Sequence, residues 1–207
     1  MMKSLFAYFM FFFLLSCSVT KPSTGDNLIF TKNNLQTDQQ FTPPNREITI
    51  IEGEYVQVKY EFKGVKLARK VHEGEEYFFV HIQNFGKMGQ PGAPALPMRN
   101  DLLKVPQDSK PVLEIVESDY VVYDEITIYP ASEPISDVYG AKPPAFYKDK
   151  RIYQKNQFFP ENLVAIVSDQ MASGNRFVRV QIRPVQLNPV TKKIRVYSRI
   201  VYRLKFQ

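Results

Sequence analysis

Hydrophobic and polar residues alternate with a period of two along much of this chain. In segment 56–62 the even positions hold Val, Tyr or Phe, and the odd positions hold Gln, Lys or Glu. Segment 177–184 repeats the pattern with aliphatic residues between Arg and Gln. The longest run, 194–206, has apolar residues at nearly every even position and Arg or Lys at most odd ones. Such alternation is typical of strands with one buried face.

The last two of these runs are separated by a segment with strong turn signals. Asn188-Pro189 interrupts the pattern, and proline has no N–H to donate to a neighbouring strand. Thr191-Lys192-Lys193 then supplies a polar tip. We therefore expect segments 177–184 and 194–206 to form a large hairpin.

Further strands are predicted where β-branched and aromatic residues gather, at 48–51, 77–82, 112–116 and 120–129. A Ser118-Asp119 turn is expected between the last two. The chain has 15 prolines, which argue against long helices. Residues 46–207 are therefore predicted to form an all-β domain, an antiparallel β-sandwich of about eight or nine strands.

One long connection interrupts this strand pattern. Residues 130–150 contain four prolines and no sustained period of hydrophobic residues. Long structureless connections inside compact domains are uncommon and often carry function. We therefore treat this segment as the candidate functional loop.

The N-terminus has the features of an export signal. A short basic start is followed by the apolar run 5–15, which is too short to span a bilayer because a spanning helix needs about 20 apolar residues. The run ends in Leu14-Leu15-Ser16-Cys17, which resembles a bacterial lipobox. We expect residues 1–16 to be a lipoprotein signal peptide, with lipidation at Cys17, the only cysteine of the chain. The alternative is that Cys17 is only a small apolar residue of an ordinary signal peptide.

Residues 17–45 are polar, contain few aliphatic residues, and close on Pro43-Pro44. This composition is typical of a tether that lifts a domain off a membrane. The sequence therefore predicts an exported lipoprotein at the outer membrane or cell surface of a Gram-negative bacterium, with the membrane as a partner through the lipid anchor.

Composition and charge narrow the classes of function. The chain is 44% hydrophobic and 14% aromatic, as suits pleated sheets. Its 27 Lys and Arg against 21 Asp and Glu give a net charge of +6, spread along the strands. A nucleic-acid binder usually concentrates such charge in a patch with a recognisable motif, and none is found. We therefore predict no nucleic-acid partner.

The sequence does not offer a cysteine and histidine pair that could act as a catalytic site. Cysteine-dependent catalysis needs a thiolate beside an imidazole, and Cys17 belongs to the leader. The two histidines, His72 and His81, are interpreted as a surface and a strand residue, because neither has the spacing to other ligands that a zinc site requires. We predict no enzyme activity, no metal and no cofactor for this chain.

An ordered set of motifs resembles a known family. Phe158-Phe159-Pro160 precedes a strand, a Gly-Asn turn and an alternating strand, and Pro184-Val185-Gln186 leads into Asn188-Pro189-Val190-Thr191. Upstream, Gly92-Ala93-Pro94-Ala95-Leu96-Pro97 precedes the short segment 103–106. In this order, over residues 77–204, the motifs resemble the N-terminal propeptide domain of gingipain-type cysteine peptidases, peptidase family C25.

The resemblance implies a partner and a site. A propeptide of this family binds the peptidase catalytic domain, assists its folding, and keeps it latent by inserting a loop into the active-site cleft. Ile135-Ser136-Asp137 fall where arginine-specific members place a basic anchor. Because Asp137 is acidic, three readings stay open: the cognate pocket differs, Lys142 is the anchor, or the loop is no longer inhibitory. A further alternative is that Ser136 and Asp137 only cap a turn.

Two other functions stay open at this point. The chain could be a surface lipoprotein with a structural or adhesive role, as Asp137 and the lipobox suggest. It could also be the truncated N-terminal part of a C25 peptidase precursor, because the sequence given stops just after segment 194–206.

Overall fold

The structure is a computed structural model, which describes residues 27–29, 42–134, 139 and 144–207. These residues form three antiparallel sheets and a single short helix. No helix in these ranges has the length and apolar character needed to cross a membrane. The expected all-β antiparallel class is confirmed.

The first sheet is built around the last strand of the chain. One side of β12 (Lys193–Phe206) pairs with β8 (Pro111–Tyr123) along nearly its whole length. Its other side pairs with β11 (Val185–Asn188) and then with β3 (Tyr55–Glu61). β2 (Asn45–Ile51) pairs with β3. Among the described strands, β8 therefore forms one edge of this sheet, and β2 and the short β11 lie along the other.

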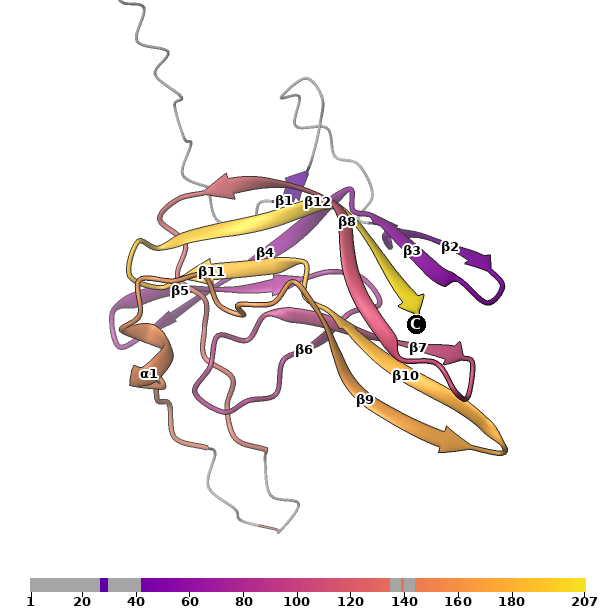
Figure 1. Cartoon of the computed structure of the whole chain (residues 1–207). Coiled ribbons are helices and arrows are strands. Elements are labelled where there is room, and N and C mark those ends of the chain that lie inside the picture. Colours follow the sequence, from indigo (N-terminus) through magenta and orange to yellow (C-terminus); the bar gives the residue numbers. More distant parts are fainter. Residues whose placement is uncertain (1–26, 30–41, 135–138, 140–143) are drawn as a thin grey trace, which may run out of the picture.

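Two more sheets complete the domain. The second sheet runs in the order β6 (Gly86–Lys87), β7 (Pro97–Val105), β10 (Asn175–Ile182) and β9 (Val164–Ala172). The third contains β1 (Asn27–Ile29), β4 (Gly64–His72) and β5 (Glu75–His81). Figure 1 shows β2, β3 and β8 above β7, β9 and β10, so that the two larger sheets face each other.

The buried faces of these strands make one apolar core. The even positions of β3 and positions 178, 180 and 182 of β10 are buried, as their alternation predicts. They join buried residues of β4, β5, β7 and β12 in a single hydrophobic cluster. Full burial of a Val, Leu, Ile or Phe side chain contributes roughly 1.5–3 kcal/mol, so this cluster is the main source of stability.

The structure corrects the predicted hairpin. β10 pairs with β7 and β9, whereas β12 pairs with β11, β8 and β3, so the expected partnership of segments 177–184 and 194–206 is wrong. The turn itself exists between β11 and β12. There the side-chain oxygen of Asn188 accepts from the N–H groups of Val190 and Thr191, each at 3.2 Å.

Two other expectations were wrong in detail. The Ser118-Asp119 turn does not exist, because β8 runs through both residues with only a shift of register against β12. β8 ends at Tyr123, and the rest of the expected strand 120–129 makes isolated bridges such as Phe78 with Ile128. β4 was not expected as a strand. The described residues thus contain 12 strands rather than eight or nine, and three of them are two to four residues long.

Candidate functional site: the loop 131–149 and its base

The candidate functional loop leaves the domain after Tyr129 and returns at α1 (Lys150–Tyr153). Its described parts are residues 131–134, 139 and 144–149. Tyr139 has a fully exposed side chain. The predicted site residues Ile135, Ser136, Asp137 and Lys142 lie outside the described residues, as does Cys17, so their roles stay predictions.

The outgoing end of the loop is held by β5. The N–H of Phe78 donates to the carbonyl of Thr127 at 2.8 Å, and the N–H of Tyr129 donates back to the carbonyl of Phe78 at 3.0 Å. The carbonyl of Tyr129 in turn accepts from the N–H of Ala95 at 3.0 Å. Backbone bonds on both sides therefore fix the direction in which the chain enters the loop.

Both ends of the loop meet at Gly92. The N–H of Gly92 donates to the carbonyl of Ala131 at 2.8 Å, and the N–H of Ala131 donates to the carbonyl of Ala93 at 2.7 Å. The carbonyl of Gly92 accepts from the N–H of Asp149 at 2.9 Å. One turn of the chain thus bonds the residue that opens the loop and the residue that closes it. We call this the Gly92 clamp (Gly92, Ala93, Ala131 and Asp149).

Asp149 also begins the helix that follows the loop. Its carboxylate accepts from the N–H of Arg151 at 2.9 Å, as an N-cap does, and from the Arg151 guanidinium at 2.8 Å. The Arg151 side chain lowers the pKa of Asp149. At the end of α1, the hydroxyl of Tyr153 donates to the carbonyl of Ile128 at 2.9 Å. The helix after the loop is therefore tied to the segment before it.

An aromatic cluster packs under the returning end of the loop. The ring of Phe146 lies 4.1 Å from that of His72, 5.2 Å from Tyr129 and 5.6 Å from Tyr77, measured between ring centres. His72 was expected as a surface residue, but its ring packs between Phe146 and the edge of Tyr129. Contacts between aromatic rings at these separations contribute about 0.5–1.5 kcal/mol each beyond burial.

A lysine extends this anchor. Lys148 donates to Glu75 at 2.9 Å, and its ammonium group lies 4.9 Å from the centre of the Tyr77 ring. Burial alone would lower the pKa of Lys148, but hydrogen bonds to Tyr77 and Glu75 raise it. Tyr77 and Lys148 also lower the pKa of Glu75. Lys148 is therefore charged at neutral pH and holds residues 144–149 against β5.

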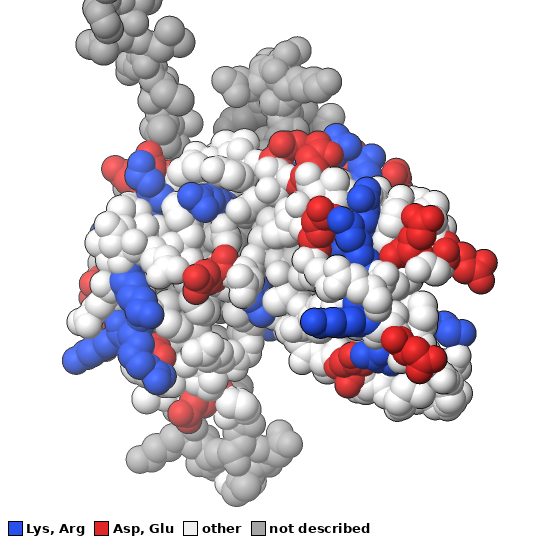
Figure 2. Space-filling view, in the orientation of Figure 1, with Lys and Arg blue, Asp and Glu red and all other residues white. Residues whose placement is uncertain are grey.

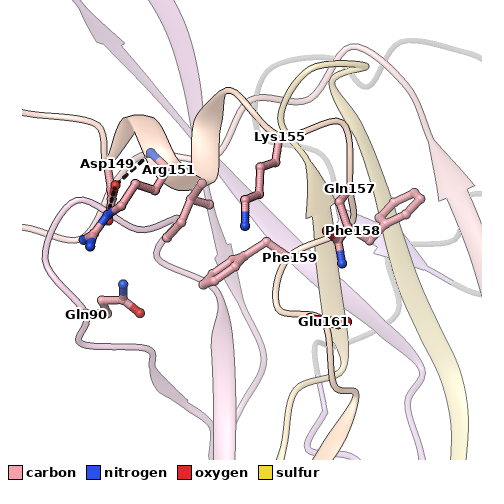
Figure 3. A pocket seen from close by; sticks show the side chains of 9 residues that line it. Gln90, Asp149, Arg151, Lys155, Gln157, Phe158, Phe159 and Glu161 are labelled. Atoms are coloured by element: carbon pink, nitrogen blue, oxygen red, sulfur yellow. Dashed lines mark hydrogen bonds and ion pairs between the residues drawn. The ribbon is translucent and has the colours of Figure 1, made fainter.

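A cleft of about 310 Å³ opens beside the returning end of the loop. Figure 3 shows it between α1 and the Phe158-Phe159 segment, with the Lys155 side chain directed toward the Phe159 ring. Asp149 lines the cleft as well. Neither Lys155 nor Glu161, a further lining residue, forms an ion pair within the described part of the chain. The cleft therefore lies next to the base of the loop, and its lining combines apolar side chains with the charges of Lys155 and Glu161.

The Phe-Phe-Pro and Pro-Val-Gln motifs meet in space. Phe159 and Leu187 exchange two backbone hydrogen bonds of 2.8 Å. The Gln186 amide donates to the carbonyl of Pro160 at 2.8 Å, and its oxygen accepts from the Tyr197 hydroxyl at 2.8 Å. The peptide bond between Phe159 and Pro160 is cis. These contacts dock the segment after α1 onto the first sheet.

Sequence reasoning pointed to the Gly-x-Pro-x-Leu-Pro motif but not to its contacts. A glycine before a proline-rich segment signals a turn, whereas its bonds to residues about 40 and 60 positions away are set by the tertiary fold. His81 is a strand residue, as expected, and burial followed by repulsion from Lys87 and Lys66 lowers its pKa. Within the described ranges, no three His, Cys, Asp or Glu side chains come together as metal ligands would.

These features define an antiparallel β domain that presents one long loop from a firmly bonded base. The Propeptide_C25 family model matches residues 39–207, and the chain belongs to this family. The resemblance seen in the sequence motifs is thereby confirmed. The family describes the propeptide of C25 peptidases and not their catalytic part.

Individual relatives agree with this assignment. Gingipain R2 of Porphyromonas gingivalis is 28% identical over 115 residues, which are 55% of this chain and 15% of that protein. Gingipain R1 of the same species is 27% identical over 113 residues, 55% of this chain and 11% of that protein. The match therefore spans only a small part of the length of these curated relatives.

Two solved structures share the fold. One is described as a complex of the pro- and mature domains of RgpB from Porphyromonas gingivalis, with a TM-score of 0.72, 21% identity, and coverage of 80% of this chain and 87% of that one. The other concerns the zymogenic latency of gingipain K from the same species, with a TM-score of 0.67, 19% identity, and coverage of 90% and 100%.

Proposed function

We propose that this domain binds the catalytic domain of a gingipain-type cysteine peptidase and keeps it latent, or assists its folding, by inserting loop 131–149 into the active-site cleft. The observation that carries the proposal is the Gly92 clamp, which bonds Ala131 and Asp149 to one turn. Membership of the propeptide family and the RgpB complex of pro- and mature domains support the choice of partner.

A loop held in this way suits an inhibitor. Binding a partner costs about 0.5–1.5 kcal/mol for each flexible side chain that becomes ordered, in addition to the ordering of the loop backbone. The backbone bonds at the clamp and the packing of Phe146 order both ends of the loop before any partner arrives. More of the contact energy then remains as affinity.

The surface next to the loop favours an acidic partner face. Figure 2 shows basic side chains gathered at the left, over the position of α1 in Figure 1. Lys150 and Arg151 belong to this helix, and Lys155 follows it. Arg151 is paired with Asp149, but neither Lys150 nor Lys155 has an ion pair among the described residues. We infer that these two lysines face acidic residues around the peptidase cleft and speed encounter between the two proteins.

Two residues of the loop, Asp137 and Lys142, are candidates for the anchor that enters the specificity pocket of the peptidase. Ile135-Ser136-Asp137 occupy the anchor position implied by the family, and Lys142 is the nearby basic alternative. An acidic pocket would repel Asp137 and accept Lys142. A pocket with a basic or neutral lining would accept Asp137. The charge of the anchor residue therefore indicates which substrate side chains the cognate peptidase accepts.

Inhibition assays with purified C25 peptidases test the proposal. The soluble domain, residues 18–207, is compared with Asp137→Ala and Lys142→Ala, and with Lys63→Ala as a matched lysine variant in the exposed β3–β4 connection. We expect competitive inhibition of at least one peptidase, lost with one loop variant and retained with Lys63→Ala. Inhibition that survives replacement of residues 132–148 by a short Gly-Ser linker would overturn the loop mechanism.

A second candidate function follows from the acidic Asp137 and the lipobox at Cys17. In this reading the domain is an exported surface lipoprotein with a structural or adhesive role. The linker variant distinguishes the two functions, because an adhesive role without the loop predicts unchanged cell-surface attachment, and latency predicts an unregulated peptidase.

A further inference from the structure

We propose that Gly92 is the positioning residue of the peptidase-binding loop: it sets the spacing and direction of both loop ends, and a side chain in its place would displace the returning end. The inference rests on the proposed function for its biological meaning. The clamp itself can be tested without a peptidase.

The space around Gly92 is already filled by the returning end of the loop. A Cβ atom at this position would lie 2.4 Å from Cε2 and 2.9 Å from Cζ of Tyr147, and 3.1 Å from the backbone nitrogen of Asp149. The exposed Tyr147 ring can turn away from such an atom, but the backbone nitrogen of Asp149 would have to move by a few tenths of an ångström. A side chain would therefore shift Tyr147 and strain the bond from Asp149 to the Gly92 carbonyl.

The backbone conformation adds a second requirement. Gly92 has φ +76°, in the left-handed region that side chains disfavour. Gly53, Gly74 and Gly174 also have positive φ values, but a Cβ there would meet nothing within 4 Å. Those three glycines only allow the backbone conformation of their hairpin turns. Gly92 alone among these four combines the strained turn with close contact to the loop.

Because Gly92 bonds to both ends of the loop, the positions of the two ends depend on each other. If Gly92 moves, the carbonyl of Ala131 and the N–H of Asp149 lose their partner together. The outgoing end keeps the bond of Ala131 to Ala93, and the returning end keeps the contacts of Phe146 with Tyr129 and of Lys148 with Glu75. Before α1 the returning end would then be held by side-chain contacts alone and would sample more conformations, which a partner would have to order again on binding.

The main experiment compares Gly92→Ala with Gly53→Ala, which carries the same backbone strain at φ +74° in an open turn. We expect Gly92→Ala to raise the inhibition constant for the cognate C25 peptidase about tenfold or more. Gly53→Ala should leave the inhibition constant unchanged, although it carries the same unfavourable φ. Equal inhibition constants for the two variants would overturn the proposal.

A second pair keeps the test valid should Gly92→Ala fail to fold. Asp149 has φ −67°, which proline accepts, so Asp149→Pro removes the N–H bonded to Gly92 without a change of φ. Asp149→Ala loses the same capping carboxylate but keeps this N–H. We expect a larger rise of the inhibition constant for Asp149→Pro than for Asp149→Ala, and the opposite order would contradict the clamp.

Hydrogen exchange separates failure of the clamp from failure of the proposed function. In the wild-type domain alone, the amides of Gly92, Ala131 and Asp149 should exchange slowly, and in Gly92→Ala they should lose at least tenfold in protection while the core strand β10 keeps its own. Unchanged protection would refute the clamp. A wild-type domain that shows this protection but inhibits no peptidase would refute the proposed function and leave the clamp intact.

Discussion

The phenolic hydroxyl of Tyr202 on β12 donates to the carboxylate of Asp101 on β7 at 2.7 Å, which joins the two larger sheets through a charged group inside the core. Tyr60 donates to the same carboxylate at 2.9 Å, and Arg46 forms an ion pair with it at 3.0 Å. Burial and the nearby carboxylate raise the pKa of Tyr60 and Tyr202, so both hydroxyls remain protonated donors at neutral pH.

Removal of the Asp101 carboxylate should destabilise the domain strongly. In Asp101→Ala two buried hydroxyls and the Arg46 guanidinium lose their acceptor, so we expect a loss of about 3 kcal/mol in the free energy of unfolding. Urea denaturation followed by circular dichroism measures it. Asp108→Ala, at an exposed turn, should change it by less than about 0.5 kcal/mol. Equal unfolding midpoints for the two variants would show that the carboxylate is not needed.

The pair of Asp149 and Arg151 makes the base of the loop sensitive to acid. Because Arg151 lowers the pKa of Asp149 below its usual 3.8, the pair stabilises the folded domain fully above the unfolded value of about 3.9. That contribution is lost as pH falls through the lowered folded pKa. Titration of the Asp149 carboxyl by NMR should give a midpoint below 3.8, rising in Arg151→Ala and unchanged in Lys150→Ala. A wild-type midpoint at or above 3.8 would contradict the assignment.

The edge strand β8 should promote self-association. Among the described residues it pairs on one side only, with β12, and it has exposed Ile115, Val116 and Val121. A long apolar edge is a template for pairing with another chain. We expect sedimentation velocity to show association that rises with concentration and falls in Val116→Lys, because a charge opposes edge pairing. Glu52→Lys, in the exposed β2–β3 turn, is the matched control for added charge. The same association in both variants would argue against this edge.

Lipidation at Cys17 predicts partition into membranes. Each buried CH₂ of an acyl chain contributes about 0.8 kcal/mol, so a multiply acylated protein should stay in the detergent phase of a Triton X-114 extraction. Cys17→Ser should move it to the aqueous phase, while Ser18→Ala should not. An aqueous wild-type protein would indicate an ordinary signal peptide.

Local alternation predicted strands better than it predicted their partners. Strands β3 and β10 were found because β3 over its whole length, and β10 from Val178 on, keep one buried face. The partner of β12 was assigned wrongly because pairing depends on contacts between distant segments, and several strands present equally apolar faces. The Ser118-Asp119 turn was predicted from residue types that favour turns. Pairing with β12 overrides that preference.

The candidate functional loop was predicted from its prolines and its missing hydrophobic period, whereas the contacts at its base could not be predicted. The residues described between Ala131 and Asp149 belong to no strand or helix, as that prediction expects. Neither the Gly92 clamp nor Asp101 could be deduced, because a glycine and an aspartate in strand-rich sequence signal a turn or a polar face. Only the fold brings Gly92 to Asp149, and Asp101 to Tyr202.

The central place of β12 has a consequence for the order of events during synthesis. This strand supplies the pairing partner of β3, β8 and β11, whose residues precede it by up to about 150 positions. Such long-range pairings form slowly, because the entropy of closing the loop between distant segments is lost before their contacts can stabilise the chain. A nascent chain that has not yet released residues 193–206 cannot close its first sheet. The last strand to leave the ribosome therefore decides when the domain can complete its fold.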